Sequence, residues 1–423
     1  MEGSSLRLSA AGFNAHRQLE FIEEEEASQQ SSNYSSYRTI ATSSKSLSVA
    51  FAGWSYTILQ VDDQLHLLGH HDNQTPPTDQ TNSSSQATPV AISLPQPTSF
   101  LPEPSAQSLK FFGTPTSPLG AVTPSGHFLL LLHHPNRSVP NLSLTPASTT
   151  PQTSPKFSAI ALTTSGTLCA AVHNAPASST THLLQFLSFD TFEAWYLDPS
   201  GDVKPTHFQV PGHCAQLEGM ATGFVYLNHG GPGADARGGG GGGGGGGEVF
   251  TWGDARHAAC LGRAVGAEAP ADRPGVVETL LGVGVGKVAV GSWMVAALSE
   301  GDEAAYVWGK GRPNAVEPKR IDALPGEGEE NVRLVEVGVG EGEDGLGMSV
   351  EDVGVGGGHV VVLAEGGRVF VAGENGNGQL GLGEGADDFV EDWSEVKEWK
   401  GRHVAKVWCG VDNSFVLATN RNP

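Results

Sequence analysis

The sequence predicts an all-β fold in which short antiparallel hairpins follow one another around a closed ring. Three observations lead to this prediction. Hairpin-like units recur along the 423 residues, glycine and acidic turn residues separate their strands, and the two ends of the chain look like complementary parts of one unit. Two strands cannot bury a face alone, so each unit needs neighbours. Hairpin repeats that close into a ring, a β-propeller, protect strand edges that would otherwise promote aggregation.

The clearest unit covers residues 353–383. Residues 360–363 are Val-Val-Val-Leu, a β-rich run that predicts a strand. Glu365-Gly366-Gly367 then predicts a tight turn, because glycine accepts a positive φ without a steric penalty. Residues 369–371 return, and the segment GENGNGQLGLG leaves the sheet. This stretch is therefore one hairpin with its exit.

Related units occur along the chain. Residues 48–70 repeat the pattern around an Asp-Asp turn, residues 288–311 repeat it around an acidic turn, and residues 249–263 supply a return strand with its exit. Counting the outgoing strands gives seven, near residues 49, 109, 157, 214, 288, 353 and 404. The sequence therefore predicts a seven-bladed β-propeller that forms a single domain over residues 1–423.

The two chain ends complement each other. Residues 6–21 contain a return strand and an exit with no preceding outgoing strand, whereas residues 404–419 supply an outgoing strand with no return. We therefore expect the N-terminal and C-terminal strands to lie in the same blade and close the ring.

Several segments between these units are rich in Ser, Thr, Pro, Gly or Glu, and such composition buries too little apolar area to favour order. We expect long disordered loop insertions at about 22–46, 71–107, 135–156 and 229–247, with a short strand still open at 90–94. The ten glycines at 238–247 are interpreted as an expanded hairpin tip. Outer strands are expected within 183–197, at 274–279 and at 333–337.

The composition excludes some classes of function. A net charge of −22 disfavours direct nucleic-acid binding, which depends on Lys and Arg neutralising phosphates. The four cysteines stand singly, which favours reduced thiols and a cytoplasmic protein, with the nucleus as a second compartment. We expect no membrane span and no secretory signal at the N-terminus.

No pattern of catalytic residues emerges. The sequence contains no G-x-S-x-G, P-loop or H-E-x-x-H segment, and its serines and histidines do not pair at a recognisable spacing. His213, Cys214, His257 and Cys260 lack the spacing of a structural zinc site, and Cys260 is interpreted as a packing residue. We therefore expect a protein that is not an enzyme and that has neither a metal nor a cofactor.

The pairing of G-x-x-x-T-x-x-L with W/A-G-x-N-x-x-G-Q-L-G resembles the regulator of chromosome condensation repeat family. The resemblance is strongest at 356–383, good at 53–69 and 6–19, and degenerate elsewhere. It implies seven blades of four strands each. Within the family, the split terminal repeats look most like the alpha-tubulin suppressor-like branch.

The resemblance implies function through protein partners. In the alpha-tubulin suppressor-like branch the implied partner is a small zinc-binding diphthamide biosynthesis protein, so the chain would be an accessory subunit in diphthamide formation and Elongator-dependent tRNA modification, as a monomer or heterodimer. A first alternative is a guanine nucleotide exchange factor for a small GTPase. A second is a ubiquitin-pathway or cytoskeletal adaptor. In each case we expect a non-catalytic protein-binding scaffold.

Candidate interface residues lie at or near the starts of the hairpins. Trp54, Trp293 and Trp408 are candidate anchors, since Trp is enriched at interface hot spots, and packing between blades is the alternative role. His359 and Asn413 occupy the position where the family tends to have His, and a structural role lining the ring is the alternative for His359. A further set is expected to hold the repeat structure: Gly12, Asn14, Gly53, Gly69, Trp252, Gly253, Trp308, Gly309, Gly373, Asn375, Gly378, Gln379, Leu380, Gly381 and Gly410.

Overall fold

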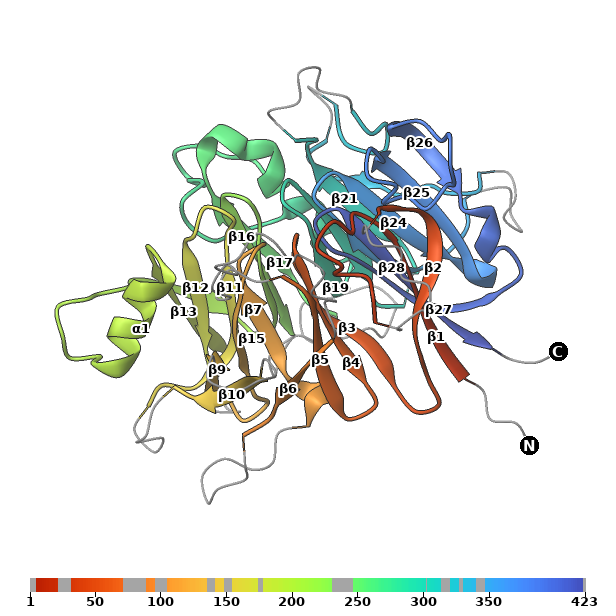
Figure 1. The fold of residues 1–423 in the computed structure, drawn as a ribbon. Helices are drawn as coiled ribbons and strands as arrows, with labels where there is room; N and C mark the ends of the chain where they lie inside the picture. Colours follow the sequence, from red (N-terminus) through yellow and green to blue (C-terminus); the bar gives the residue numbers. More distant parts are fainter. Residues whose placement is uncertain are drawn as a thin grey trace.

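The computed structural model describes most of the chain and confirms the all-β prediction. The described residues are 5–21, 32–70, 89–95, 105–134, 141–147, 154–173, 178–229, 246–301, 303–312, 320–326, 330–339 and 347–420. Within them, the strands form five four-stranded sheets and one eight-stranded sheet (Figure 1). No helix in these ranges is long and apolar enough to cross a membrane.

The strands follow one another in groups of four, each group starting with an innermost strand. The groups are β3 (Leu47–Ala52), β4 (Tyr56–Val61), β5 (Gln64–Gly69) and β6 (Val90–Ser93); β7 (Lys110–Gly113), β8 (Pro118–Val122), β9 (Phe128–His134) and β10 (Asn141–Pro146); β11 (Phe157–Leu162), β12 (Leu168–Val172), β13 (Thr180–Phe186) and β14 (Thr206–Pro211). They continue with β15 (His213–Gly219), β16 (Gly223–His229), β17 (Val249–Gly253) and β18 (Gly275–Val276); β19 (Val285–Val290), β20 (Met294–Ser299), β21 (Ala305–Gly309) and β22 (Arg333–Leu334); β23 (Val350–Val355), β24 (His359–Ala364), β25 (Arg368–Glu374) and β26 (Phe389–Glu395).

The last sheet joins the two ends of the chain, as the sequence predicted. Its order is β2-β1-β28-β27, with β1 (Ser5–Gly12), β2 (Tyr34–Ser43), β27 (His403–Cys409) and β28 (Asn413–Asn420). β1 pairs antiparallel with β28 without a register break, from Ser5 opposite Asn420 to Gly12 opposite Asn413. Figure 1 shows the N and C labels on the same side of the molecule. The residues at 404–419 form two strands, however, and not the single outgoing strand expected.

The eight-stranded sheet consists of two consecutive groups joined at their outer edges. Its order is β3-β4-β5-β6-β10-β9-β8-β7, and the link is a short parallel pairing of Leu142 with Ile92 and Ser143 with Ser93. Divided at this link, the sheet gives two four-stranded groups whose innermost strands begin at Leu47 and Lys110. The innermost strands of all groups begin close to the seven outgoing strands expected from the sequence.

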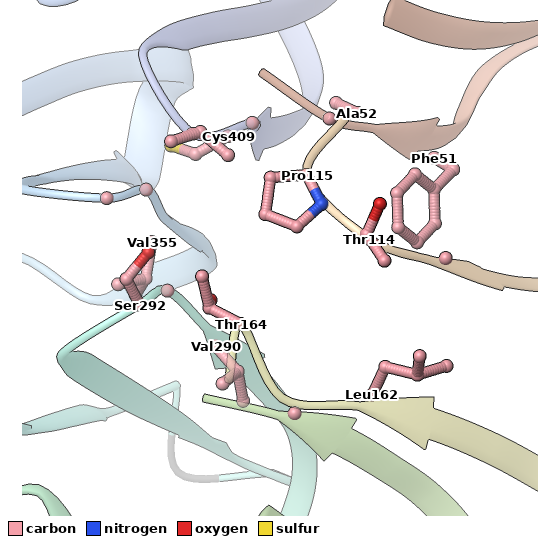
Figure 2. A pocket seen from close by; sticks show the side chains of 18 residues that line it. Phe51, Ala52, Thr114, Pro115, Leu162, Thr164, Val290, Ser292, Val355 and Cys409 are labelled. Carbon is pink, nitrogen blue, oxygen red and sulfur yellow. The ribbon is translucent and has the colours of Figure 1, made fainter. Parts of the chain in front are cut away.

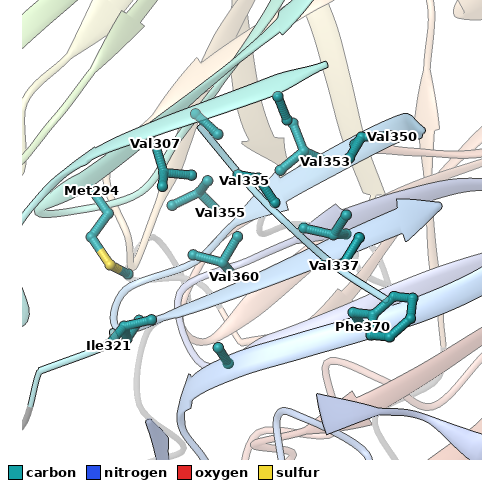
Figure 3. Packing of buried hydrophobic residues seen from close by; sticks show 14 of the residues in the cluster. Met294, Val307, Ile321, Val335, Val337, Val350, Val353, Val355, Val360 and Phe370 are labelled. Atoms are coloured by element: carbon teal, nitrogen blue, oxygen red, sulfur yellow. The ribbon is translucent and has the colours of Figure 1, made fainter. Parts of the chain in front are cut away.

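Successive sheets pack face to face, and their contact layers form the core. One layer lies between the β19–β22 and β23–β26 sheets and contains Met294, Val307, Val353 and Phe370, all buried (Figure 3). Val is the most frequent residue of this layer, because β-branched side chains fit the pleated surface. The core is therefore divided among the interfaces of neighbouring sheets.

Two segments expected to be disordered insertions contain strands, so that part of the prediction is wrong. β2 lies within 22–46, where Tyr37, Ile40 and Ala41 are buried among polar residues. β10 lies within 135–156, where Leu142 and Leu144 alternate with Ser and Thr. Outer strands bury few side chains, so their composition resembles that of loops. β6 confirms the short strand at 90–94.

The segment 183–197 was expected to supply outer strands, but only its first part does. β13 ends at Phe186, and α1 (Phe189–Leu197) follows. Ser188 caps the helix in a capping box with Thr191, and Phe192 and Tyr196, one turn apart, are buried against the sheet. The outer strand is β14. Short 3-10 helices complete the described structure: η1 (Ala106–Ser108), η3 (Ala255–Leu261), η4 (Glu278–Leu280), η5 (Glu365–Gly367) and η6 (Lys397–Trp399).

The expected outer strands at 274–279 and 333–337 correspond to the two-residue strands β18 and β22. The parts of the expected insertions at 71–88, 96–104 and 230–245 lie outside the described residues. The last of these ranges includes the glycines at 238–245. Gly247 forms an isolated bridge with Val285.

Candidate partner-binding face

One face of the ring is built from two kinds of loop. We call it the loop face: it comprises the loops between the first and second strand of each group and the segments that follow each third strand. Main-chain hydrogen bonds join the first kind of loop from group to group. Trp54 N–H donates to the Pro115 carbonyl at 2.6 Å, Ala221 N–H to Ser292 at 2.7 Å, and Gly357 N–H to Val411 at 2.8 Å. Figure 2 shows these loops around a central opening. The face therefore has a rigid rim.

The segments after the third strands reach forward to the next group. Gln18 Nε2 donates to the Trp54 carbonyl at 2.9 Å. Cys260, which stands where the repeat pattern has Gln, makes the corresponding contact, because its Sγ lies 3.3 Å from the Trp293 carbonyl. Cys260 is buried, and burial raises the pKa of its thiol to about 11, so it serves as a packing residue.

The exit motif folds the same way at both ends of the chain. Asn14 Oδ1 accepts from Leu19 N–H at 3.0 Å, and Asn375 Oδ1 accepts from Leu380 N–H at 3.1 Å. In each copy the Gln side chain also accepts a main-chain N–H two residues earlier, His16 for Gln18 and Asn377 for Gln379. The buried Asn and Gln side chains thus replace the hydrogen bonds that the departing backbone loses.

Glycine at the end of the third strand permits close approach to the second strand. Gly12, Gly69, Gly309 and Gly373 all have positive φ, between +86° and +116°, and a Cβ on any of them would overlap the facing main chain. Gly253 occupies the same place without a positive φ, and a Cβ there would lie 2.6 Å from the Thr222 carbonyl oxygen. Its requirement for glycine is therefore steric.

The remaining structural positions lie between sheets, against β2 or at the central opening. Trp252 and Trp308 are fully buried, and their indole N–H groups donate to Gln185 Oε1 and to the Cys260 carbonyl. Gly378 and Gly381 have positive φ and lie against β2, where a Cβ on Gly381 would overlap the Tyr37 ring. Gly53 and Gly410 line the central opening. Leu380 is buried beside Tyr37 and Trp399.

Trp54 is the centre of an aromatic cluster on the loop face. Its ring stacks on Phe13, with centroids 5.2 Å apart and planes at 16°, and His16 packs edge-on at 5.0 Å. His70 lies 6.2 Å from His16. Burial, with a smaller effect from His70, lowers the pKa of His16, so its ring is neutral near pH 7. Trp54 is 37% exposed although its carbonyl and N–H are both bonded. The cluster is therefore a preorganised, half-open apolar surface.

Trp293 lies in a second, more polar cluster. His257 packs edge-on against its indole at 4.8 Å, and Lys310 Nζ lies 5.5 Å from the ring centroid. Lys310 Nζ also contacts His257 Nδ1 at 2.7 Å, which requires a neutral imidazole. Burial, followed by the charge of Lys310, lowers the pKa of His257 accordingly. The indole is partly buried by these neighbours.

An ion-pair network crosses three groups on the same face. Arg312 pairs with Asp412 and, through Nε at 3.1 Å, with Glu374 Oε2. Arg312 comes from the segment after β21, Glu374 ends β25, and Asp412 lies between β27 and β28. The network links consecutive sheets at the rim.

The other candidate residues do not lie on the exposed part of this face. His359 and Asn413 are fully buried, so neither side chain can contact a partner in this structure. His359 Nε2 donates to Ser414 Oγ at 2.9 Å, because that hydroxyl itself donates to the Gln379 carbonyl. Trp408 lines the axial cavity instead, where Lys406 Nζ lies 5.2 Å from its ring. The three candidate Trp residues therefore belong to three separate places.

The sequence analysis missed several residues of this face. Phe13, His70, Lys310 and Glu374 each directly follow the glycine that ends a third strand. The chain turns outward there, so the next side chain is presented on the loop face. The repeated glycine was identified from the sequence. The residue that follows this glycine in each repeat would have indicated which side chains lie on the loop face.

Among the described residues, no three His, Cys, Asp or Glu side chains are arranged to hold a metal ion. The face instead combines aromatic rings, ion pairs and main-chain groups, which suit recognition of another macromolecule.

Comparison with known proteins bears on the fold and on the repeat. The model of the regulator of chromosome condensation (RCC1) repeat matches residues 350–379. The E3 ubiquitin-protein ligase HERC2 of human and that of mouse are each 29% identical over 179 residues. These matches cover 40% of this chain and 3% of each relative, so the chain spans only a small fraction of the length of the curated relatives it matches.

Solved structures show the same fold along almost the whole chain. Prp20p from Saccharomyces cerevisiae, a protein studied for its binding to Gsp1p and histones, has a TM-score of 0.57 at 14% identity, covering 99% of this chain and 92% of that one. Human WBSCR16 has a TM-score of 0.56 at 15% identity, covering 99% of both chains.

The matched repeat at 350–379 covers β23, β24, β25 and the beginning of their exit, and the same exit geometry recurs at Asn14. Together with the ring of antiparallel sheets closed by β1 and β28, these findings show that the chain is a β-propeller that carries an RCC1 repeat at 350–379.

Proposed function

We propose that this propeller is a non-catalytic platform that binds a protein partner through the aromatic cluster of Phe13, His16, Trp54 and His70 on the loop face. The observation that carries the proposal is Trp54, a large aromatic side chain that is 37% exposed while its main chain is fixed on both sides. Exposed Trp on a rigid support is a favourable interface anchor, because little conformational entropy is lost on binding.

The test compares the purified protein with two variants as bait in the native organism. Trp54→Ala removes the anchor, and Leu281→Ala truncates an apolar side chain that is 52% exposed outside the cluster. Quantitative mass spectrometry should show a specific partner reduced at least tenfold on Trp54→Ala, on the scale expected for loss of a hot spot, and unchanged on Leu281→Ala. Equal recovery of every partner by all three baits would refute the proposed site.

The finer proposal concerns the identity of the partner. The resemblance to the alpha-tubulin suppressor-like branch supports a small zinc-binding diphthamide biosynthesis protein, with the chain acting as an accessory subunit in diphthamide formation and Elongator-dependent tRNA modification in the cytoplasm. Co-purification of that protein with Elongator subunits tests this assignment. Recovery of tubulin or ubiquitin-ligase components in their place would favour the adaptor role, which the local similarity to HERC2 supports.

A second candidate function is nucleotide exchange on a small GTPase. The fold similarity to Prp20p, studied for its binding to Gsp1p, favours it. A nucleotide-release assay with purified GTPases separates the two functions. Faster release at substoichiometric propeller would establish exchange activity, whereas tight binding without faster release would support the platform.

A further inference from the structure

The innermost strands enclose a cavity along the axis of the ring. Its volume is about 430 Å³, and its lining comes from β3, β7, β11, β15, β19, β23 and β27. A narrower continuation of about 130 Å³ leads to the loop face, where Gly53, Gly291 and Gly410 line it (Figure 2). The two share Phe51, Cys409 and other wall residues, so they form one axial passage. A volume of this size suits a small organic ligand.

Most polar side chains of the wall are already paired. Lys287 Nζ contacts Asp352 Oδ1 at 2.5 Å and donates to the Val353 carbonyl at 2.8 Å. The Gln216 side chain accepts from Val288 N–H at 2.8 Å and donates to the Val288 carbonyl at 3.3 Å. These groups bind the neighbouring strand and have little capacity left for a ligand.

Lys406 differs from them. It occupies the position in β27 that Lys287 occupies in β19, four residues before the glycine of the following loop, and it lines the cavity with its side chain exposed. Its ammonium lies 5.2 Å from the Trp408 ring centroid. Within the ranges that the structure describes, no carboxylate lies within ion-pair distance of it. A lysine held over an aromatic ring and facing a cavity is available to an anion.

The other charged group of the wall, Glu218, opposes an anion less than its type suggests. The surrounding cavity wall raises the pKa of this carboxyl group, against the attraction of Lys110, although the residue is exposed to the cavity. Since Lys287 is paired with Asp352, Lys406 is the cation of the described cavity wall that remains to attract an anion. Phe51, Phe111 and Trp408 supply apolar wall beside it.

We propose that the axial cavity binds a small organic anion, with a carboxylate or phosphate group on Lys406 and a flat apolar body against Trp408 and Phe51. This site is separate from the proposed partner surface at Trp54, so either can be correct without the other.

Phenyl phosphate and benzylamine are matched probes, because they share an aromatic ring and differ in the sign of their charge. Isothermal titration calorimetry at pH 7 should show saturable binding of phenyl phosphate to the wild-type protein and none of benzylamine. Inorganic phosphate, which lacks the ring, should bind more weakly than phenyl phosphate, and benzoate should also bind because it places a carboxylate on the same ring. Absence of saturable phenyl phosphate binding, or equal binding of benzylamine, would overturn the proposal.

Two variants change the affinity for phenyl phosphate in opposite directions. Lys406→Gln should weaken it at least tenfold, whereas Glu218→Gln should strengthen it, because the remaining negative charge is removed. Lys400→Gln is the control, since Lys400 lies outside the cavity wall with its side chain 64% exposed. Urea unfolding establishes that each variant is folded. Unchanged affinity in Lys406→Gln, or weaker binding in Glu218→Gln, would refute the site.

Discussion

Lys287 Nζ lies 2.5 Å from Asp352 Oδ1, and the two residues belong to the innermost strands of successive sheets. Asp352 in turn accepts from Val407 N–H on the next innermost strand at 3.0 Å. Lys110 likewise reaches forward, to the carbonyls of Ser158 and Ala215. These side chains connect several neighbouring innermost strands and form part of a polar belt around the axis.

The belt gives a first prediction. Asp352→Ala should lower the free energy of unfolding by about 2–4 kcal/mol, because it leaves the Lys287 ammonium and the Val407 N–H without their partner in a mostly buried place. Urea denaturation measures the change. The control is Asp254→Ala, whose ion-pair partner Arg256 is 82% exposed. Loss of that exposed ion pair should lower the free energy of unfolding much less. Equal losses for the two variants would contradict the role of the belt.

A second prediction concerns Gly373, the penultimate residue of β25. Gly373→Ala should destabilise the protein by at least about 2 kcal/mol, because φ is +109° and the new Cβ would overlap the Gly358 carbonyl oxygen. Gly385→Ala has a comparable backbone, with φ of +82°, but open space around it, so it should cost only about 1 kcal/mol. Urea unfolding of the pair separates steric overlap from backbone strain. A Gly373→Ala variant as stable as Gly385→Ala would show that the strands can separate at little cost.

Closure of the ring gives a third prediction. Deletion of residues 404–423 removes β28 and nearly all of β27 and leaves β1 without its partner, so cooperative thermal unfolding should be lost. Circular dichroism during heating measures this. Shortening the ten glycines at 238–247 should shift the melting temperature by less than about 2 °C, because loop length enters stability only logarithmically. A cooperative transition in the deletion variant would contradict the closing role of β28.

The buried histidine gives a fourth prediction. Burial, assisted by the charge of Arg312, lowers the pKa of His359 from 6.5 to about 3. The unfolded state therefore takes up a proton below pH 6.5 while the folded state does not, so stability is complete above pH 6.5 and falls as the pH drops towards 3. Between pH 7.5 and pH 5 this residue alone should remove about 2 kcal/mol.

His359→Gln should abolish that share of the pH dependence, although it lowers stability at every pH because the bond to Ser414 changes. Urea unfolding at pH 7.5, 6 and 5 for both proteins provides the comparison. Since other partly buried histidines also titrate, the decisive quantity is the difference between the two slopes. Parallel slopes would show that the pKa of His359 is not lowered in the folded protein.

The sequence predicted the inner part of each sheet because strong signals coincide there. The runs at 360–363 and 369–371 combine β-branched residues with a glycine turn, and β24 and β25 form where expected. Closure was also predictable, since the incomplete repeats at the two ends complement each other. These regions bury both faces, so their composition is constrained by packing.

The outer strands could not be predicted equally well. β2 and β10 leave many of their side chains exposed or half-buried, and their Ser and Thr content resembles that of a loop. α1 replaces an expected strand because Ser188 supplies a helix cap. The prediction of strands within 183–197 followed the apolar residues of that segment and did not take this cap into account. For the candidate site, the sequence placed Trp54 and Trp408 near the starts of hairpins but could not show on which side of the ring each side chain lies. Trp54 is exposed on the rim, whereas Trp408 lines the cavity.

The pairing of β1 with β28 also has a consequence for biosynthesis. On the ribosome the strand from Ser5 to Gly12 emerges first, and its hydrogen-bonding neighbour emerges only after every other sheet has been made. Until β28 emerges, one backbone edge of β1 must be shielded by something other than its final neighbour. Nascent chains arrested before residue 413 should therefore be unusually dependent on chaperones.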